Sequence, residues 1–146
     1  MIKDSRAYLY AKWCVQRGNR KVGKYVKLQA RKWLQIADGK HKEAYVSEKS
    51  YKKICKLLKL MVHPDLQCSM YEGLEDYAWL LIVAVFCTRR REDDRRFYQT
   101  ALLEIARKNF KTFNSAVIFI LGMLTEPRFS RFFSVAPDFK LSSELR

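Results

Sequence analysis

The chain has 146 residues, a net charge of +14 and an apolar fraction of 49%. This apolar fraction excludes a disordered polyelectrolyte, and the length suits one domain, or one domain with part of another. The longest apolar runs, Ala78–Cys87 and Ala116–Leu121, are shorter than the roughly 18–20 residues that a membrane helix needs. Charged residues from Lys3 onward interrupt any signal peptide. We therefore expect a folded protein with no membrane partner.

The positive charge is concentrated in the first part of the chain. Residues 1–60 hold 17 Lys and Arg against 4 Asp and Glu, whereas residues 61–146 hold 12 against 11. An excess of this density is typical of proteins that contact polyanions such as nucleic acids, although a Lys-rich solvated surface gives the same composition. The contrast predicts two modules, and the sequence divides best into residues 1–73 and 74–146.

The four cysteines, Cys14, Cys55, Cys68 and Cys87, have none of the short spacings of a zinc or redox motif. Each falls at an apolar position, where a cysteine usually serves as a small buried side chain. The sequence therefore predicts four free thiols and no metal site built on them.

Helical periodicity runs through the first 88 residues. Helices are expected at about 4–16, 24–37, 47–62 and 74–88, with Asp4 or Ser5 and Ser47 as N-caps. The third helix separates an apolar stripe from a face of five lysines, Lys49, Lys52, Lys53, Lys56 and Lys59. The fourth is apolar on nearly all sides, so it must be buried. The charged run 89–96 compensates itself and predicts a solvated loop.

The pattern changes after residue 96. Phe97–Ile105 reads as a buried strand, Thr112–Leu124 as an apolar helix, Phe132–Ala136 as a second strand, and Pro137 opens another helix. A strand–loop–helix–strand order is the opening unit of a doubly wound parallel sheet. The predicted class is therefore α/β, a helical N-terminal region followed by the start of such a sheet. Because two parallel strands cannot cover both of their faces, we expect a longer protein.

The loop between the first strand and its helix ends on Lys111 and Thr112. In P-loop proteins, backbone amides surround the phosphates, a Lys reaches the outer phosphates, and a Ser or Thr hydroxyl binds Mg²⁺. Ile105 and Phe110 occupy the two Gly positions of that pattern. An ordinary basic turn at a helix start, with Thr112 as its N-cap, is the competing interpretation.

In the order of these features the chain resembles the N-terminal part of the large terminase subunit of tailed bacteriophages, the ATPase that packages DNA. The likeness rests on Tyr10-Ala11, Val22–Lys27 and Ala30-Arg31 in the helical leader, the helix Leu74–Phe86, the loop Glu104–Thr112 and the stretch Ser134–Asp138. The family's loop usually reads A-R-K-N-G-K-[S/T], and Ala106–Thr112 differs from it only at Phe110.

The resemblance implies an ATP site with Mg²⁺. Lys111 and Arg107 would act on the transferred phosphate, Arg107, Lys108, Asn109, Lys111 and Thr112 would bind the nucleotide, and Thr112 would ligate the metal. It also implies a complete enzyme that oligomerises, works on double-stranded DNA with a small terminase subunit and a portal, and acts in the cytoplasm of the infected host. The family's Walker B carboxylates and nuclease ligands would lie beyond Arg146. Its adenine-binding Gln has no clear counterpart near Ala78 and Trp79.

Two alternatives come from the basic half of the chain. A helical module that binds nucleic acid without hydrolysing ATP would explain the charge of residues 1–60. In addition, His63-Pro64-Asp65 after a Lys-rich helix resembles the signature of chaperone J-domains, although the expected opening helix of that family is missing.

Overall fold

A computed structural model describes residues 2–106, 109–127 and 129–135. The chain forms two compact units, Met1–Ala101 and Leu102–Arg146. The sequence-based division at residue 74 assigns the helix α5 (Asp76–Cys87) to the second module, whereas the structure has this helix in the first unit.

The first unit is mainly helical. Its elements, in chain order, are η1 (Ile2–Asp4), α1 (Arg6–Cys14), α2 (Lys24–Ala37), β1 (Ala44–Val46), α3 (Glu48–Leu60), α4 (Met70–Gly73), α5 (Asp76–Cys87) and β2 (Thr88–Arg90). The four helices predicted from periodicity are confirmed as α1, α2, α3 and α5. Two of the predicted N-caps are also confirmed, since the hydroxyls of Ser5 and Ser47 accept from the amides of Tyr8 and Ser50.

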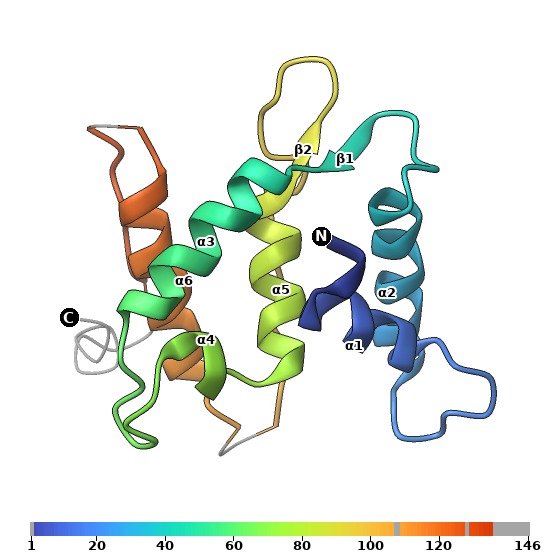
Figure 1. Ribbon diagram of the computed structural model, residues 1–146, viewed down its shortest axis with the longest axis horizontal. Coiled ribbons are helices and arrows are strands. Elements are labelled where there is room, and N and C mark those ends of the chain that lie inside the picture. The colour runs from blue at the N-terminus through green and yellow to red at the C-terminus, as the bar shows by residue number, and fades with distance from the viewer. Residues whose placement is uncertain (1, 107–108, 128, 136–146) are drawn as a thin grey trace. The chain divides into compact units, whose positions relative to one another are not determined.

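Helix α5 forms the centre of this unit. Six of its side chains are buried: Ala78, Trp79, Ile82, Val83, Phe86 and Cys87. Helix α1 packs against one part of it and α3 against another, as Figure 1 shows, while α2 packs on α1. The apolar stripe of α3 contributes Ile54 and Leu58, both fully buried. A helix that is apolar nearly all round is stable only with cover on several sides, and α1 and α3 supply it.

A two-stranded antiparallel sheet closes the unit. Strand β1 pairs with β2 in a register that places Ala44, Tyr45 and Val46 opposite Arg90, Arg89 and Thr88. The buried indole of Trp33 on α2 donates to the Thr88 hydroxyl at 3.3 Å and joins α2 to β2. The molecule is thus a mixture of helices with a small sheet.

The charged run 89–96, predicted as a solvated loop, is more ordered than expected. Its first residues belong to β2, and an isolated bridge pairs Arg89 with Arg96. Arg90 forms an ion pair with Asp93 at 2.7 Å, and the Tyr45 hydroxyl donates to Asp94. The basic and acidic residues of the run neutralise one another, as predicted. The run also folds back on the edge of the sheet.

The second unit contains α6 (Lys111–Thr125), which confirms the apolar helix predicted at 112–124. Phe132 packs on this helix: its ring lies 5.5 Å from that of Phe119 and would lie 3.0 Å from a Cβ at Gly122. The strand predicted over 97–105 does not form, and no strand is found at 132–135 in the described part of the unit. A strand requires a ladder of hydrogen bonds to a neighbour. The Phe97 amide donates to the Thr88 carbonyl of β2 at 2.9 Å, but the residues after Phe97 do not continue this pairing into a strand.

Among the residues described, no helix is both long and apolar enough to cross a bilayer. The longest, α6, has 15 residues.

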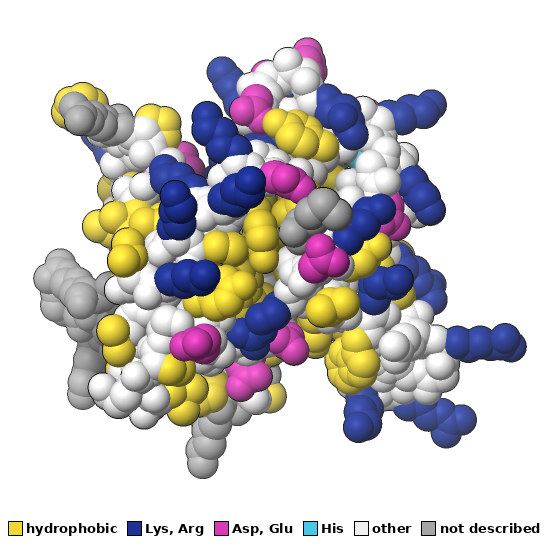
Figure 2. Space-filling model, viewed as in Figure 1, with side chains coloured by type: hydrophobic (Ala, Val, Ile, Leu, Met, Phe, Trp, Pro, Cys, Tyr) yellow, Lys and Arg dark blue, Asp and Glu magenta, His cyan; other side chains and the backbone are white. Residues whose placement is uncertain are grey.

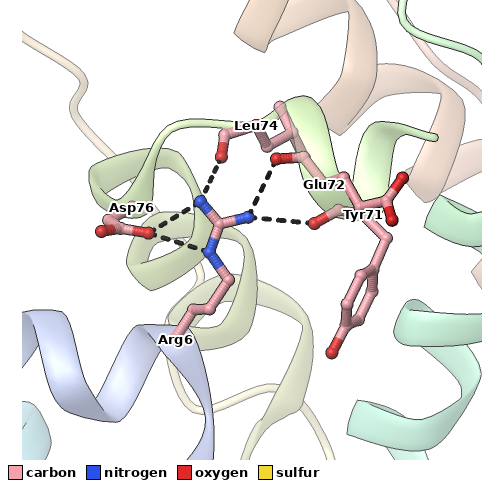
Figure 3. Close-up of polar contacts among 5 residues, drawn as sticks. All are labelled: Arg6, Tyr71, Glu72, Leu74 and Asp76. Atoms are coloured by element: carbon pink, nitrogen blue, oxygen red, sulfur yellow. Dashed lines mark hydrogen bonds and ion pairs between the residues drawn. The ribbon is translucent and has the colours of Figure 1, made fainter. Parts of the chain in front are cut away.

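Arg6 joins the start of α1 to the segment that leads into α5 (Figure 3). Its guanidinium donates to the carbonyls of Tyr71, Glu72 and Leu74, at 2.8–3.2 Å, and forms an ion pair with Asp76 at 2.8 Å. The same group lies 5.9 Å from the centre of the Trp79 ring. These carbonyls lie at the end of α4, where no intrahelical donor remains for them. The planar guanidinium of Arg6 supplies the missing donors and thereby joins α1 to the end of α4.

We expect Arg6→Ala to lower the free energy of unfolding by about 1–2 kcal/mol, because several polar groups lose a charged partner that is only partly exposed. Arg6→Lys should recover less than half of this loss, since an ammonium cannot reproduce the planar set of donors. The matched control is Arg31→Ala on an exposed position of α2, which should change stability by less than about 0.5 kcal/mol. Urea unfolding measures all three, and equal effects of Arg6→Ala and Arg31→Ala would contradict this role.

Candidate functional site

The residues predicted to bind a phosphate fall around the start of α6. Lys111 and Thr112 are its first two residues, and both side chains are exposed. Asn109 precedes them, and its amide nitrogen donates to the Ala106 carbonyl at 3.4 Å. Arg107 and Lys108 lie outside the described residues. The structure therefore brings three of the five predicted site residues together at one helix end.

Phe110 is the N-cap of α6 and adopts a left-handed backbone, with φ 52° and ψ 30°. Glycine reaches this region without cost, whereas a side chain with a Cβ is strained there. Phe110 stands at the position where P-loops carry glycine, so the backbone has the conformation that glycine favours even though the residue differs. The sequence shows that glycine is absent at this position but cannot show that the backbone is left-handed there.

The Phe110 ring bends toward its own helix. It lies 6.2 Å from the ring of Phe113 in an edge-to-face arrangement and remains about half exposed, at 52%. This contact compensates part of the backbone strain. The ring therefore packs beside the first turn of α6.

The first turn of α6 has the chemistry of an anion site. The amides of Lys111 and Thr112 have no intrahelical acceptor at this position, and the helix dipole adds a partial positive charge. The alternative role proposed for Thr112, as N-cap of the helix, is wrong, because Phe110 is the cap residue and Thr112 is the second residue of the helix. The Thr112 hydroxyl is thus not committed to capping.

The other candidate residues have structural roles. His63 is buried, and its Nδ1 accepts from the amides of Asp65 and Leu66 at 3.3 and 3.2 Å, which fixes the His63-Pro64-Asp65 turn. A Cβ at Gly73 would lie 2.8 Å from the imidazole Cδ2, so the turn packs tightly on α4. This motif serves the fold rather than presenting an exposed His.

The cysteines are free thiols, as predicted. Burial raises the pKa of Cys87 to about 12, which leaves it unreactive at neutral pH. Burial also raises the pKa of Cys14 and Cys55. Within the described residues no group of three or more His, Cys, Asp or Glu side chains is placed to hold a metal.

Two surfaces of the first unit are rich in exposed basic residues. One consists of Arg17, Arg20 and Lys21 in the loop before α2 and of Lys24, the first residue of α2. Asn19 organises this loop, since its side chain donates to the Trp13 carbonyl at 2.9 Å and accepts from the Lys21 amide at 3.0 Å. The other is α3, where the five predicted lysines are exposed, and Figure 2 shows Lys and Arg side chains gathered over this helix.

Comparison with protein-family models, curated proteins and solved structures finds no match for this chain.

The left-handed turn at Phe110 predicts an unusual order of stabilities. Phe110→Ala and Phe110→Gly both remove the ring, but only glycine relieves the backbone, so Phe110→Gly should be more stable than Phe110→Ala by about 1 kcal/mol. At a position inside a helix the order is reversed, because glycine has the more flexible unfolded state. Thermal or urea unfolding of the two variants gives the sign directly, and an alanine variant that is the more stable would rule the turn out.

Proposed function

We propose that this chain is the N-terminal portion of a DNA-packaging ATPase of the large terminase type, and that residues 107–112 form its ATP-phosphate loop. The supporting observation is the position of Lys111 and Thr112, exposed at the first turn of α6 directly after a residue with left-handed backbone. The first turn of a helix has free amides, and here it also has an exposed ammonium and an exposed hydroxyl, a set of groups that suits a polyphosphate.

In this proposal each residue of the loop has a distinct task. Lys111 places its charge against the outer phosphates, and Arg107 faces the phosphate that is transferred. Lys108 and Asn109 contribute to the cradle, and the Thr112 hydroxyl reaches the Mg²⁺ that accompanies ATP. Bound ATP supplies the reactive phosphate and Mg²⁺ neutralises its charge, while the chain's own residues orient and hold it.

The finer fold is part of the same proposal. Phe97–Ile105 and Phe132–Ala136 would become strands of a doubly wound parallel sheet once neighbouring strands supply their hydrogen bonds. Double-stranded DNA would be the substrate that is moved. A small terminase subunit and a portal would be the partners, with several copies acting together in the cytoplasm of the infected host.

If the loop binds ATP, Lys111→Ala should weaken binding of Mg·ATP by about 10- to 100-fold, because a hydrogen bond to a charged group contributes about 1.5–3 kcal/mol. Isothermal titration of the 146-residue chain measures this. The matched control is Lys56→Ala, which removes the same charge from an exposed position on α3. Equal weakening in both variants would show that only the overall charge attracts the nucleotide.

Phe110→Gly supplies a second arm of this test. It keeps the left-handed turn and removes the ring from the helix start, so ATP binding should be unchanged or tighter. If Phe110→Gly abolished ATP binding and Lys111→Ala left it unchanged, residues 107–112 would not be a phosphate loop. The charge of the helical leader would then favour a binding module.

A second candidate function is non-enzymatic binding of nucleic acid by the first unit. The observation that favours it is the absence of any Asp or Glu between Ser5 and Ala37, a stretch that includes the exposed basic loop before α2. With no base-reading motif in the sequence, such binding would be made to phosphates and would show no sequence preference.

DNA affinity should therefore fall steeply between about 50 and 200 mM salt and be the same for unrelated duplexes. The triple change Arg17→Ala, Arg20→Ala and Lys21→Ala should reduce the salt slope by about one for each phosphate that the variant no longer neutralises. The control triple Lys49→Ala, Lys53→Ala and Lys56→Ala, on α3, should reduce it less. Fluorescence anisotropy follows the titrations; binding that is independent of salt, or absent at the lower salt, would count against this candidate.

A further inference from the structure

The lysines of α3 occupy one side of the helix. At 100° per residue, Lys49, Lys52, Lys53, Lys56, Lys59 and Leu60 fall within an arc of about 120°. All six side chains are exposed, and the sequence contains no Asp or Glu from Lys49 to Pro64. We call this surface the lysine ridge. It is a positive strip that begins at Lys49, after the exposed Glu48 at the first position of α3, and reaches the end of the helix.

The ridge ends on an apolar tip. Leu60 is 81% exposed, Val62 64% and Leu66 60%, and the last two belong to the loop that follows α3. These three aliphatic side chains lie in one short stretch at the end of the ridge. Because they are exposed to solvent, they lose the stabilisation that burial would give them. Exposed apolar groups next to a polar rim are typical of sites where another molecule docks.

The tip is held in place before any partner arrives. The amide of Met70 donates to the Met61 carbonyl and that of His63 to the Cys68 carbonyl, both at 2.7 Å, and Val62 bridges to Ser69. His63 Nδ1 accepts the amide of Leu66. At the end of the ridge, the Lys59 ammonium lies 4.8 Å from the centre of the Tyr71 ring on α4. A surface fixed in this way binds at a low cost in conformational entropy.

We propose that the lysine ridge and the apolar tip dock an acidic, amphipathic helix of a partner protein. Carboxylates on the partner would lie along the five ammonium groups, and its aliphatic side chains would cover Leu60, Val62 and Leu66. A nucleic acid would use the ridge but would leave the aliphatic tip exposed to water. A lipid surface would favour exposed aromatic rings beside the lysines, whereas the Tyr71 ring next to Lys59 is half-buried. This inference does not depend on the proposed ATP site.

The test uses two labelled peptides of about five helical turns each. One carries Leu at helical spacing and Glu at most other positions, and the second has every Leu replaced by Ser, so that both have the same charge. The full chain should bind the first at least about tenfold more tightly, as measured by fluorescence anisotropy. The double variant Leu60→Ser and Val62→Ser should abolish this tenfold preference, whereas Lys52→Glu with Lys56→Glu should weaken binding of both peptides.

The matched control is Val26→Ser, which removes an aliphatic side chain that is 45% exposed on α2 and should leave the preference intact. Because all the substituted side chains are exposed, the variants should keep the helical circular dichroism of the parent. Equal binding of the two peptides, or no binding of either, would overturn the proposal. A short DNA duplex and vesicles containing phosphatidylserine are tested in the same way. The proposal would also be overturned if the double variant Leu60→Ser and Val62→Ser lost binding to the duplex or to the vesicles but kept its binding to the peptides.

Discussion

The first unit depends on the need to bury α5. This helix is apolar nearly all round and has no polar face to give to water, so other elements must cover it. Helices α1 and α3 do so, and the lysines of α3 remain exposed while its Ile54 and Leu58 are buried. Arg6 then fixes the direction in which the chain enters α5 by bonding three carbonyls and Asp76. The basic surface of α3 is therefore the outward face of a helix that helps to form the core.

The sequence predicted those features in which local pattern and packing agree. The period of α2 and α3, and the serine caps of α1 and α3, are local properties, and each was predicted correctly. The sheet of β1 and β2 was not predicted, because its two strands have three residues each and are separated by α3 to α5. Arg6 gave no signal, since its partners lie about 70 positions away. Phe97–Ile105 has the composition of a strand, but composition cannot supply the neighbouring strand that a ladder requires.

The candidate site was predicted in part. Pattern placed Lys111 and Thr112 at the start of a helix, and the structure has both there. The sequence pattern could not predict the backbone conformation of Phe110, because phenylalanine rarely adopts the left-handed region. Strain of this kind persists only where the surroundings impose it, and it is often found at functional positions. The two observations, a lysine at the first turn and a glycine-like bend before it, are the basis of the proposed ATP loop.

The most direct measurement of that proposal is a titration of the ¹⁵N-labelled chain with Mg·ATP, followed by NMR of the backbone amides. Amides that donate to phosphate oxygens shift strongly, so the account predicts that the largest changes occur at Lys111 and Thr112 and at the loop residues before them. Amides of α1, α2 and α3 should shift little. Changes centred on the basic loop before α2 or on the lysine ridge, with none at the start of α6, would show nucleotide binding by surface charge and would contradict a phosphate loop.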